Sequence, residues 1–293
     1  MAGSGFQNGL PCPISGANAE GSEMDEIRGR MTREGIRVHE LSDFTGMERA
    51  GRLAATILDD IADHVVPGVT TGALDEAVTG WVEAAGATSA TIGYKGYRHA
   101  TCISVNHVVC HGIPGDKKLK DGDILNIDVT VVVDGWYGDS SRMYVAGTPS
   151  VKAARLIQVA HDGLMRGIEA VRPGATFGDI GHAIQSHVES YRMSVVRDFC
   201  GHGLGRVFHA PPNVLHYGRP GTGPVLEEGM FFTIEPMVNL GRAETKVLGD
   251  DWTAVTRDRS LSAQFEHSVG VTAQGAEVFT LSPAGRFHPT YEA

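Results

Sequence analysis

The sequence predicts an α/β (α+β) fold of two halves, related by a pseudo-twofold axis, with antiparallel strands around a central cleft. Two observations predict this class. In each half, apolar residues recur first with the spacing of helices and then with the alternation of strands. In addition, a Pro-Gly turn flanked by helical patterns occurs at Val66–Thr70 and again, 106 residues later, at Arg172–Thr176. This repetition indicates an internal duplication, and a chance similarity of the two turns is the alternative.

The first 36 residues differ from the rest of the chain. They contain Gly, Ser, Asn and Pro without periodicity, so we expect residues 1–36 to be a mobile or loosely packed N-terminal extension. A docking arm around Pro11-Cys12-Pro13 is the alternative. We expect residues 37–293 to form a single domain, although a length of 293 residues would allow two.

The helices are expected in two pairs. Apolar residues recur at three- and four-residue steps over Met47–Ile61, and Pro67-Gly68 ends this first helix. A second helix follows Thr71 and stops near Gly86. The corresponding patterns of the second half are Val151–Val171 and the segment after Thr176.

Strands are expected after each helix pair. Ile124–Val133 and Trp136–Val145 have strand-like patterns, and the Asp134-Gly135 dipeptide between them is preferred in two-residue type I′ turns. These two segments are therefore expected to form a β-hairpin. In the second half, we expect strands at Met230–Val238 and Leu261–Thr272.

Composition and charge exclude several classes of protein. The chain has 35 acidic and 25 basic residues and a formal net charge of −10, which argues against binding nucleic acid through bulk charge. Hydrophobic residues make up 42% of the sequence, too many for a disordered chain, and no apolar stretch is long enough to span a membrane. The four scattered cysteines form no disulfide framework or CxxC zinc motif, and the N-terminus lacks the pattern of a secretory signal. We therefore expect a cytoplasmic protein.

Two aspartates of the expected hairpin are candidate metal ligands. Aspartate is unfavourable inside a β-branched run such as the one around Asp128. A two-residue turn places Asp139 opposite Thr130, so that Asp128 is its diagonal neighbour on the same face. Two such carboxylates raise each other's pKa unless a cation neutralises them, which favours a divalent metal. Two aspartates on a solvent-facing side of the sheet are the alternative.

The second half contains three further candidate ligands. Glu235 lies in an apolar run, 107 positions after Asp128 and thus close to the repeat distance, and Glu266 lies between Phe265 and His267. His202 lies in a glycine-rich loop that lacks the spacing of a dinucleotide-binding motif. One imidazole and four carboxylates suit hard or borderline divalent ions such as Mn²⁺, Co²⁺, Fe²⁺ or Zn²⁺. Five ligands exceed one tetrahedral site, so we expect two ions that share carboxylates and support amide hydrolysis.

Two more histidines, His111 and His209, lie near these ligands in the sequence and are not needed for metal binding. They are free to donate hydrogen bonds to a tetrahedral intermediate or to shuttle a proton. A purely structural role is the alternative for each.

The chain resembles the type I methionine aminopeptidases over roughly residues 38–283. The motifs that carry the resemblance are Ala50-Gly51-Arg52-Leu53-Ala54-Ala55, Cys102-Ile103-Ser104-Val105-Asn106, Cys110-His111-Gly112-Ile113-Pro114, Asn126-Ile127-Asp128-Val129-Thr130, Gly138-Asp139-Ser140, Gly201-His202-Gly203-Leu204-Gly205-Arg206, Phe232-Thr233-Ile234-Glu235-Pro236-Met237 and Ser260-Leu261-Ser262-Ala263-Gln264-Phe265-Glu266-His267. The family has the pita-bread fold, two related α/β halves around a dimetal centre, which agrees with the repeat. The resemblance implies that residues 37–293 are one catalytic domain.

The resemblance also implies roles for individual residues. The five candidate ligands would bind the metals, with Asp139 and Glu266 bridging the two ions. His209 would steady the intermediate, His111 would contact the scissile amide nitrogen, and Glu235 would relay the proton of the attacking water.

Two further sites follow from the same resemblance. The residues implied for the methionine side-chain pocket are Tyr94, Tyr97, Cys102, Phe208 and Trp252, and those for a Na⁺ or K⁺ site are Asn106, Val108 and Ser262. A thioether among aromatic rings gains packing and sulfur–ring contacts.

The sequence departs from the family pattern in three places. Residues 97–101 lack the usual proline and serine, Thr91 replaces a frequent pocket cysteine, and His107 stands where an acidic residue is frequent.

The expected activity is therefore hydrolytic removal of the initiator methionine from nascent polypeptides. A crowded cleft beside the metals would favour small second residues. Nascent chains imply transient proximity to the ribosome, and we expect a monomer.

Three alternatives to this activity remain. Xaa-Pro dipeptidases or aminopeptidases share the fold and ligands, but they usually carry a large extra N-terminal domain, whereas fewer than 45 residues precede the first helix here. A non-catalytic binding protein of this fold typically lacks metal ligands, and none is missing. A structural protein with an acidic surface cluster is the third.

Overall fold

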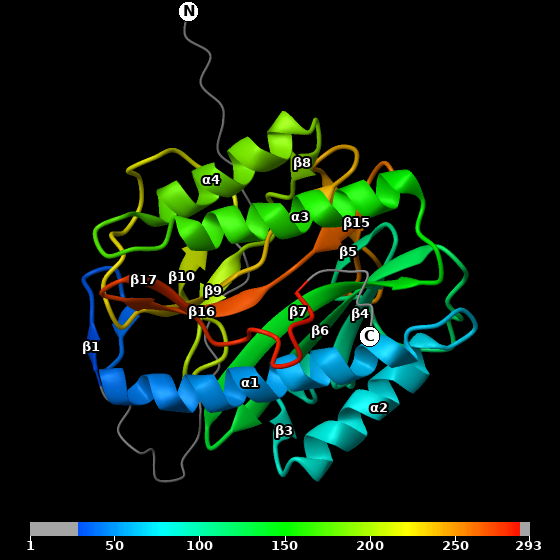
Figure 1. Ribbon diagram of the computed structural model, residues 1–293, viewed down its shortest axis with the longest axis horizontal. Coiled ribbons are helices and arrows are strands. Elements are labelled where there is room, and N and C mark those ends of the chain that lie inside the picture. The colour runs from blue at the N-terminus through cyan, green and yellow to red at the C-terminus, as the bar shows by residue number, and fades with distance from the viewer. Residues whose placement is uncertain (1–28, 288–293) are drawn as a thin grey trace, which may run out of the picture.

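The computed structural model describes residues 29–287, so that most of the expected extension lies outside the described residues (Figure 1). The α-helices are α1 (Phe44–Asp60), α2 (Thr71–Ala84), α3 (Val151–Glu169) and α4 (Phe177–Ser190). The short 3-10 helices are η1 (Leu41–Asp43), η2 (Ile61–His64) and η3 (Tyr94–Gly96). Both expected helix pairs are thus confirmed. No helix within residues 29–287 has the length and apolar character needed to cross a membrane.

The strands form several antiparallel sheets. The largest has the order β10 (Ala210–Val214), β9 (Gly201–Gly203), β11 (Phe231–Ile234), β16 (His267–Thr272) and β17 (Gly275–Val278). A four-stranded sheet contains β3 (Thr88–Ser89), β4 (Thr101–Val105), β6 (Asp123–Val133) and β7 (Trp136–Ala146), with β6 paired to the other three. Two three-stranded sheets are β15 (Ser262–Gln264), β12 (Met237–Asn239) and β8 (Ser194–Val195), and β13 (Thr245–Val247), β14 (Ala254–Thr256) and β5 (Val108–Cys110). A small hairpin pairs β1 (Arg30–Met31) with β2 (Arg37–Val38).

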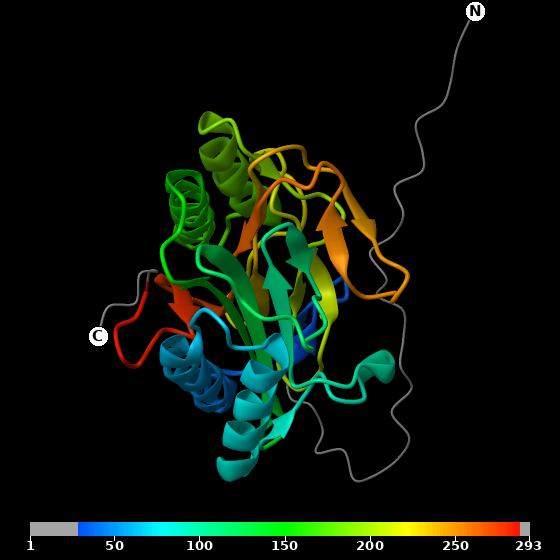
Figure 2. The same ribbon diagram turned by 90° about the vertical axis from the view of Figure 1, so that its right-hand side faces the viewer.

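Each half of the chain has its own helix pair and apolar core. Helices α1 and α2 lie against one part of the strands and α3 and α4 against the other (Figure 1), and the turned view places all four on one side of the strands (Figure 2). One core gathers apolar side chains of α1, α2, β4 and β6, and a second gathers those of α3, α4, β11 and β16. The ligand-bearing strands therefore lie where the two halves meet.

The internal duplication is present in three dimensions. The N–H of Gly68 donates to the carbonyl oxygen of Leu119 at 2.7 Å, and the N–H of Gly174 donates to that of Leu226 at 3.0 Å. Both glycines have a positive φ, 96° and 86°, which glycine adopts without steric cost. The two halves therefore repeat the same turn and the same backbone contact, 106 to 107 residues apart.

The β6–β7 hairpin has the predicted register. Asp134 and Gly135 both have positive φ, 50° and 77°, as a type I′ turn requires. Thr130 is paired with Asp139, and Asp128 lies two residues further along β6. The predicted diagonal placement of the two aspartates on one face is therefore confirmed.

The prediction of two continuous strands in the second half was wrong in one respect, because each of them is divided in two. The expected strand Met230–Val238 is interrupted at Glu235 and Pro236, and β11 and β12 belong to different sheets. Proline has no N–H to donate to a ladder. The expected strand Leu261–Thr272 is interrupted at Phe265 and Glu266, where the N–H of Glu266 donates to the carbonyl of Ser141 on β7 instead. Each interruption contains a glutamate that was expected to bind metal.

Candidate metal centre

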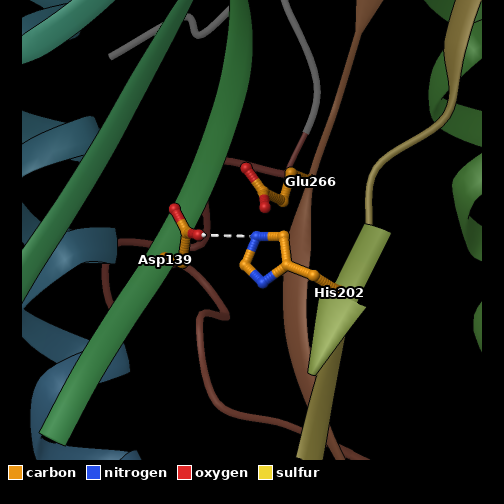
Figure 3. A group of neighbouring side chains, drawn as sticks. All are labelled: Asp139, His202 and Glu266. Carbon is orange, nitrogen blue, oxygen red and sulfur yellow. Dashed lines mark ion pairs between the residues drawn. The ribbon is translucent and has the colours of Figure 1, made fainter. Parts of the chain in front are cut away.

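The five candidate ligands come from both halves of the chain. They are Asp128 on β6, Asp139 on β7, His202 on β9, Glu235 directly after β11 and Glu266 directly before β16. Asp139, His202 and Glu266 are buried, and one ligand atom of each lies within 4.8 Å of those of the other two. Figure 3 shows these three side chains pointing toward one another from separate segments of the chain. Three side chains that are distant in sequence thus form a group able to hold a metal ion.

Glu235 and Asp128 belong to the same acidic group. Oε1 of Glu235 lies 3.8 Å from Nε2 of His202. Burial raises the pKa of Asp128 well above its usual range, and the charges of Asp139 and Glu235 raise it further. Burial and the same neighbouring carboxylates likewise raise the pKa of Glu266 well above its usual range. Four carboxylates this close repel one another unless cations lie between them.

The orientation of His202 fits metal binding. Its Nδ1 lies 3.1 Å from the carbonyl oxygen of Gly203, which can only accept, so Nδ1 carries the hydrogen. Nε2 then directs a lone pair toward Oδ2 of Asp139, 3.4 Å away. Burial lowers the pKa of His202, but hydrogen bonding to Asp139 and the charge of Glu235 outweigh it and raise the pKa. The raised pKa shows that the carboxylates favour a positive charge at Nε2, which either a proton or a metal ion supplies. A carbonyl partner for the second nitrogen is typical of metal-binding histidines.

Three side chains that the sequence did not single out as functional hold the ligands in place. Thr130 Oγ1 donates to Oδ1 of Asp139 at 2.7 Å. Thr233 Oγ1 donates to Oε1 of Glu235 at 2.8 Å, and Gln264 Nε2 donates to Oε2 at 3.3 Å. Each polar residue lies on a buried strand two residues from a ligand, and this spacing was the available signal.

His216 is a further residue that sequence reasoning missed. Its ring is fully buried, and its Nε2 accepts a hydrogen bond from the backbone N–H of Glu235 at 3.1 Å. This N–H lies at the interruption between β11 and β12, where no strand partner accepts it. Burial lowers the pKa of His216 to about 3, so the ring is neutral and can accept.

The ring of His209 lies beside the metal group, and His111 is close enough to His209 to affect its pKa. Both have positive φ, 55° and 60°, which is uncommon for residues other than glycine. The ring of His209 lies 4.2 Å from that of His202. Burial, with the nearby His202 and His111, lowers the pKa of His209 to about 2, and burial lowers that of His111 to about 4. Neutral imidazoles at this position can donate to a reacting carbonyl or accept from an amine.

The residues expected to line a methionine pocket form two aromatic pairs. The ring centroids of Tyr94 and Phe208 are 5.1 Å apart, and those of Tyr97 and Trp252 are 4.9 Å apart. Cys102 is buried and paired with Asp128 across β4 and β6. Burial, with the charge of Asp128, raises the pKa of the Cys102 thiol, so the thiol stays neutral.

Two aromatic residues extend this lining and were missed from the sequence. Phe199 lies edge-on to His111 at 5.6 Å, and Tyr137 stacks on Phe208 at 5.5 Å. Each contacts a residue already expected at the site, so the apolar surface beside the metal group is larger than the sequence indicated.

The residues expected to bind a monovalent cation are partly brought together. The carbonyl oxygen of Asn106 accepts from the N–H of Ser262 at 2.9 Å, and Val108 follows on β5. The side chain of Asn106 is bonded to Asp123 and to the N–H of Ile124.

Residues 45–273 match the metallopeptidase family M24. A methionine aminopeptidase of Rickettsia prowazekii is 57% identical over 257 residues, which cover 87% of this chain and 99% of the relative. A crystal structure of the Rickettsia prowazekii enzyme superimposes with a TM-score of 0.83, over 84% of this chain and all of that one.

Two further structures are similar. A crystal structure of methionine aminopeptidase from Thermotoga maritima is 41% identical, with a TM-score of 0.82, and covers 84% of this chain and 99% of that one. A prolidase from Pyrococcus furiosus is 21% identical, with a TM-score of 0.65, and only 65% of that chain is covered. The likeness to the prolidase shows a shared fold and nothing finer.

Proposed function

The chain belongs to metallopeptidase family M24 and, within it, to the methionine aminopeptidases with their pita-bread fold, and from this premise we propose that it hydrolyses the peptide bond after an N-terminal methionine. The observation that carries this function is the buried group of Asp139, His202 and Glu266, joined by Asp128 and Glu235 where the two halves meet. No member of the five-ligand set is missing, which argues against a non-catalytic relative of this fold.

The proposed cofactors are two divalent ions, Co²⁺, Mn²⁺, Fe²⁺ or Zn²⁺, held by the five ligands. Asp139 and Glu266 would bridge them, as the family resemblance implies, and a ligand atom of each lies within 4.8 Å of the other and of His202. Such ions, when bound, polarise a substrate carbonyl and make water nucleophilic at neutral pH. The monovalent Na⁺ or K⁺ site at Asn106, Val108 and Ser262 belongs to the same proposal.

The protein's own residues position the substrate and move protons. Glu235 would take a proton from the attacking water and return it to the leaving amine. The hydrogen bonds from Thr233 to Oε1 and from Gln264 to Oε2 hold the carboxylate in position for this role. His209, kept neutral by burial, would donate to the oxygen of the tetrahedral intermediate, and His111 would contact the scissile nitrogen.

The substrate pocket and setting are also proposed. The methionine side chain would lie among Tyr94, Tyr97, Cys102, Phe208 and Trp252. The crowded surroundings of the metal group would favour small second residues. We further propose a monomeric cytoplasmic enzyme with one catalytic domain, residues 37–293, that acts on nascent polypeptides near the ribosome.

The test is release of free methionine from the peptide Met-Ala-Ser. The protein would be treated with EDTA, assayed, and assayed again after addition of Co²⁺ or Mn²⁺, with an Ala-Pro peptide alongside. Cleavage of Met-Ala-Ser that is lost with EDTA and restored by metal supports the proposal, and Asp128→Ala serves as the ligand-deficient control.

Two other outcomes would contradict it. Cleavage of the Ala-Pro peptide alone would identify an Xaa-Pro peptidase of the same fold. Failure to cleave either peptide with any of the metals would indicate a binding protein despite the complete ligand set.

A further inference from the structure

A buried carboxylate on α2 is bonded to the segment that forms the aromatic wall of the proposed pocket. Asp75, the fifth residue of α2, is only 7% exposed. Its Oδ1 accepts from the backbone N–H of Thr101 at 2.9 Å and from Thr101 Oγ1 at 2.8 Å, and its Oδ2 lies 2.9 Å from Nδ1 of His99. Burial of a carboxylate is unfavourable unless hydrogen bonds compensate it, and here three donor groups do so.

These bonds help to place the side chain of Tyr97, whose hydroxyl also lies 3.4 Å from the carbonyl oxygen of Gly112. The hydroxyl of Tyr97 donates to the carbonyl oxygen of Thr101 at 2.8 Å, and its ring lies edge-on to His99 at 5.8 Å. Thr101 and His99, which both contact Tyr97, are thus held by the same carboxylate of Asp75. On its other side, the Tyr97 ring contacts Trp252 at 4.9 Å, so its position sets that of the Tyr97–Trp252 pair.

The segment between Tyr97 and Thr101 has backbone bonds of its own: the carbonyl of Tyr97 accepts from Gly93 at 2.7 Å, its N–H donates to Tyr94 at 2.9 Å, and the carbonyl of Ala100 accepts from Ser89 Oγ at 3.5 Å. None of these bonds holds the ring of His99 or the hydroxyl of Thr101. His99 and its neighbours lie outside regular strands, and pairing with β6 begins only at Thr101. The carbonyl of His99 accepts one further bond, from Thr91 Oγ1 at 2.7 Å. Loss of the Asp75 carboxylate would release both the ring of His99 and the hydroxyl of Thr101.

We infer that Asp75 is a positioning residue that, through His99 and Thr101, fixes Tyr97 and so sets how strictly the pocket selects methionine over other apolar N-terminal residues. The inference rests on the proposed function. An apolar pocket discriminates between substrates that differ by one methylene by about 10- to 200-fold in kcat/KM, so a displaced aromatic wall should have a measurable effect on selectivity.

The test compares kcat and KM for Met-Ala-Ser and Leu-Ala-Ser with the Mn²⁺-loaded full chain. For Asp75→Ala we expect the ratio of kcat/KM values, methionine over leucine, to fall by about 10-fold, mainly through a higher KM for Met-Ala-Ser. Asp75→Asn should retain the wild-type ratio, because its amide oxygen still accepts from Thr101 and its NH₂ can donate to His99. Glu76→Ala, at the adjacent exposed position, is the matched control.

A second variant keeps the inference testable if Asp75→Ala does not fold. His99 has a side chain that is 32% exposed, so His99→Ala removes the ring with little effect on the core. We expect the same loss of selectivity, and a Mn²⁺ affinity equal to that of wild type.

Two results would overturn the inference. An unchanged ratio in both Asp75→Ala and His99→Ala, with only a lower melting temperature, would show a purely structural role. If the wild-type protein releases methionine in the same experiment, that result refutes the role of Asp75 alone. If the wild-type protein releases no methionine, the proposed function is refuted as well.

Discussion

Thr130 Oγ1 donates a hydrogen bond to Oδ1 of Asp139 at 2.7 Å, from the residue directly opposite in the β6–β7 hairpin. This bond occupies one oxygen of the carboxylate and directs the other, Oδ2, toward His202 at 3.4 Å. The turn at Asp134-Gly135 therefore sets both the register of the hairpin and the orientation of a ligand.

The first prediction concerns this hydrogen bond. Thr130→Val keeps the branched shape of the side chain and removes the donor, so we expect the affinity of the EDTA-treated protein for Mn²⁺ to fall by about 10-fold or more. Titration calorimetry measures the change. Thr130→Ser keeps the hydroxyl and should bind nearly as wild type, whereas wild-type affinity in the valine variant would show that Asp139 needs no support.

The second prediction separates catalysis from metal binding. His209 lies beside His202, with ring centroids 4.2 Å apart, and its proposed role is to donate to the intermediate. His209→Ala should lower kcat for Met-Ala-Ser by about 100-fold or more, while the Mn²⁺ affinity changes little. His202→Ala should instead lose metal binding. Equal loss of metal by both variants would identify His209 as a ligand.

The third prediction concerns the buried acceptor behind Glu235. His216→Leu leaves the N–H of Glu235 without its acceptor, so we expect the free energy of unfolding to fall by about 1–3 kcal/mol. Urea unfolding measures this. We also expect a lower kcat at saturating Mn²⁺, because the displaced backbone carries the proton-relaying carboxylate. His216→Gln, whose amide oxygen can accept, should restore part of both quantities, and equal loss in the two variants would argue against the bond.

Local patterns predicted the hairpin and the helix pairs because each depends on neighbouring residues. Helical spacing defined α1 to α4, and the Asp134-Gly135 turn fixed the diagonal of Asp128 and Asp139. The repeat distance also pointed to Glu235, which lies 107 positions after Asp128, as a candidate ligand. These signals need no knowledge of the tertiary structure.

The interruptions of the second-half strands could not be predicted in the same way. The N–H of Glu266 leaves its own sheet for the carbonyl of Ser141, which is 125 residues away in sequence, and the strand pattern continues through this point. The acceptor role of His216 and the contact of Asp75 with His99 likewise depend on segments that meet only in the folded chain. Long-range hydrogen bonds, rather than local propensity, determine these parts of the site.

A buried histidine outside the ligand set should make stability depend on pH. The ring of His39 is 7% exposed and stacks on Phe231 at 4.3 Å with an angle of 8° between planes. Burial lowers its pKa from 6.5 to about 4, although Asp43, whose Oδ2 lies 3.6 Å from Nδ1, opposes the shift. In the unfolded chain the pKa returns to about 6.5.

The last prediction follows from this difference. The folded state favours neutral His39, so its contribution is fully present above pH 6.5 and is lost as the pH falls toward 4, by up to roughly 3 kcal/mol. His39→Phe keeps the stacked ring without a titrating group. Chemical unfolding of both metal-free proteins at pH 7.5 and pH 4.5 should show wild type losing more stability than the variant, because other groups titrate equally in both. Parallel losses would mean that His39 accepts a proton in the folded state as readily as in the unfolded one.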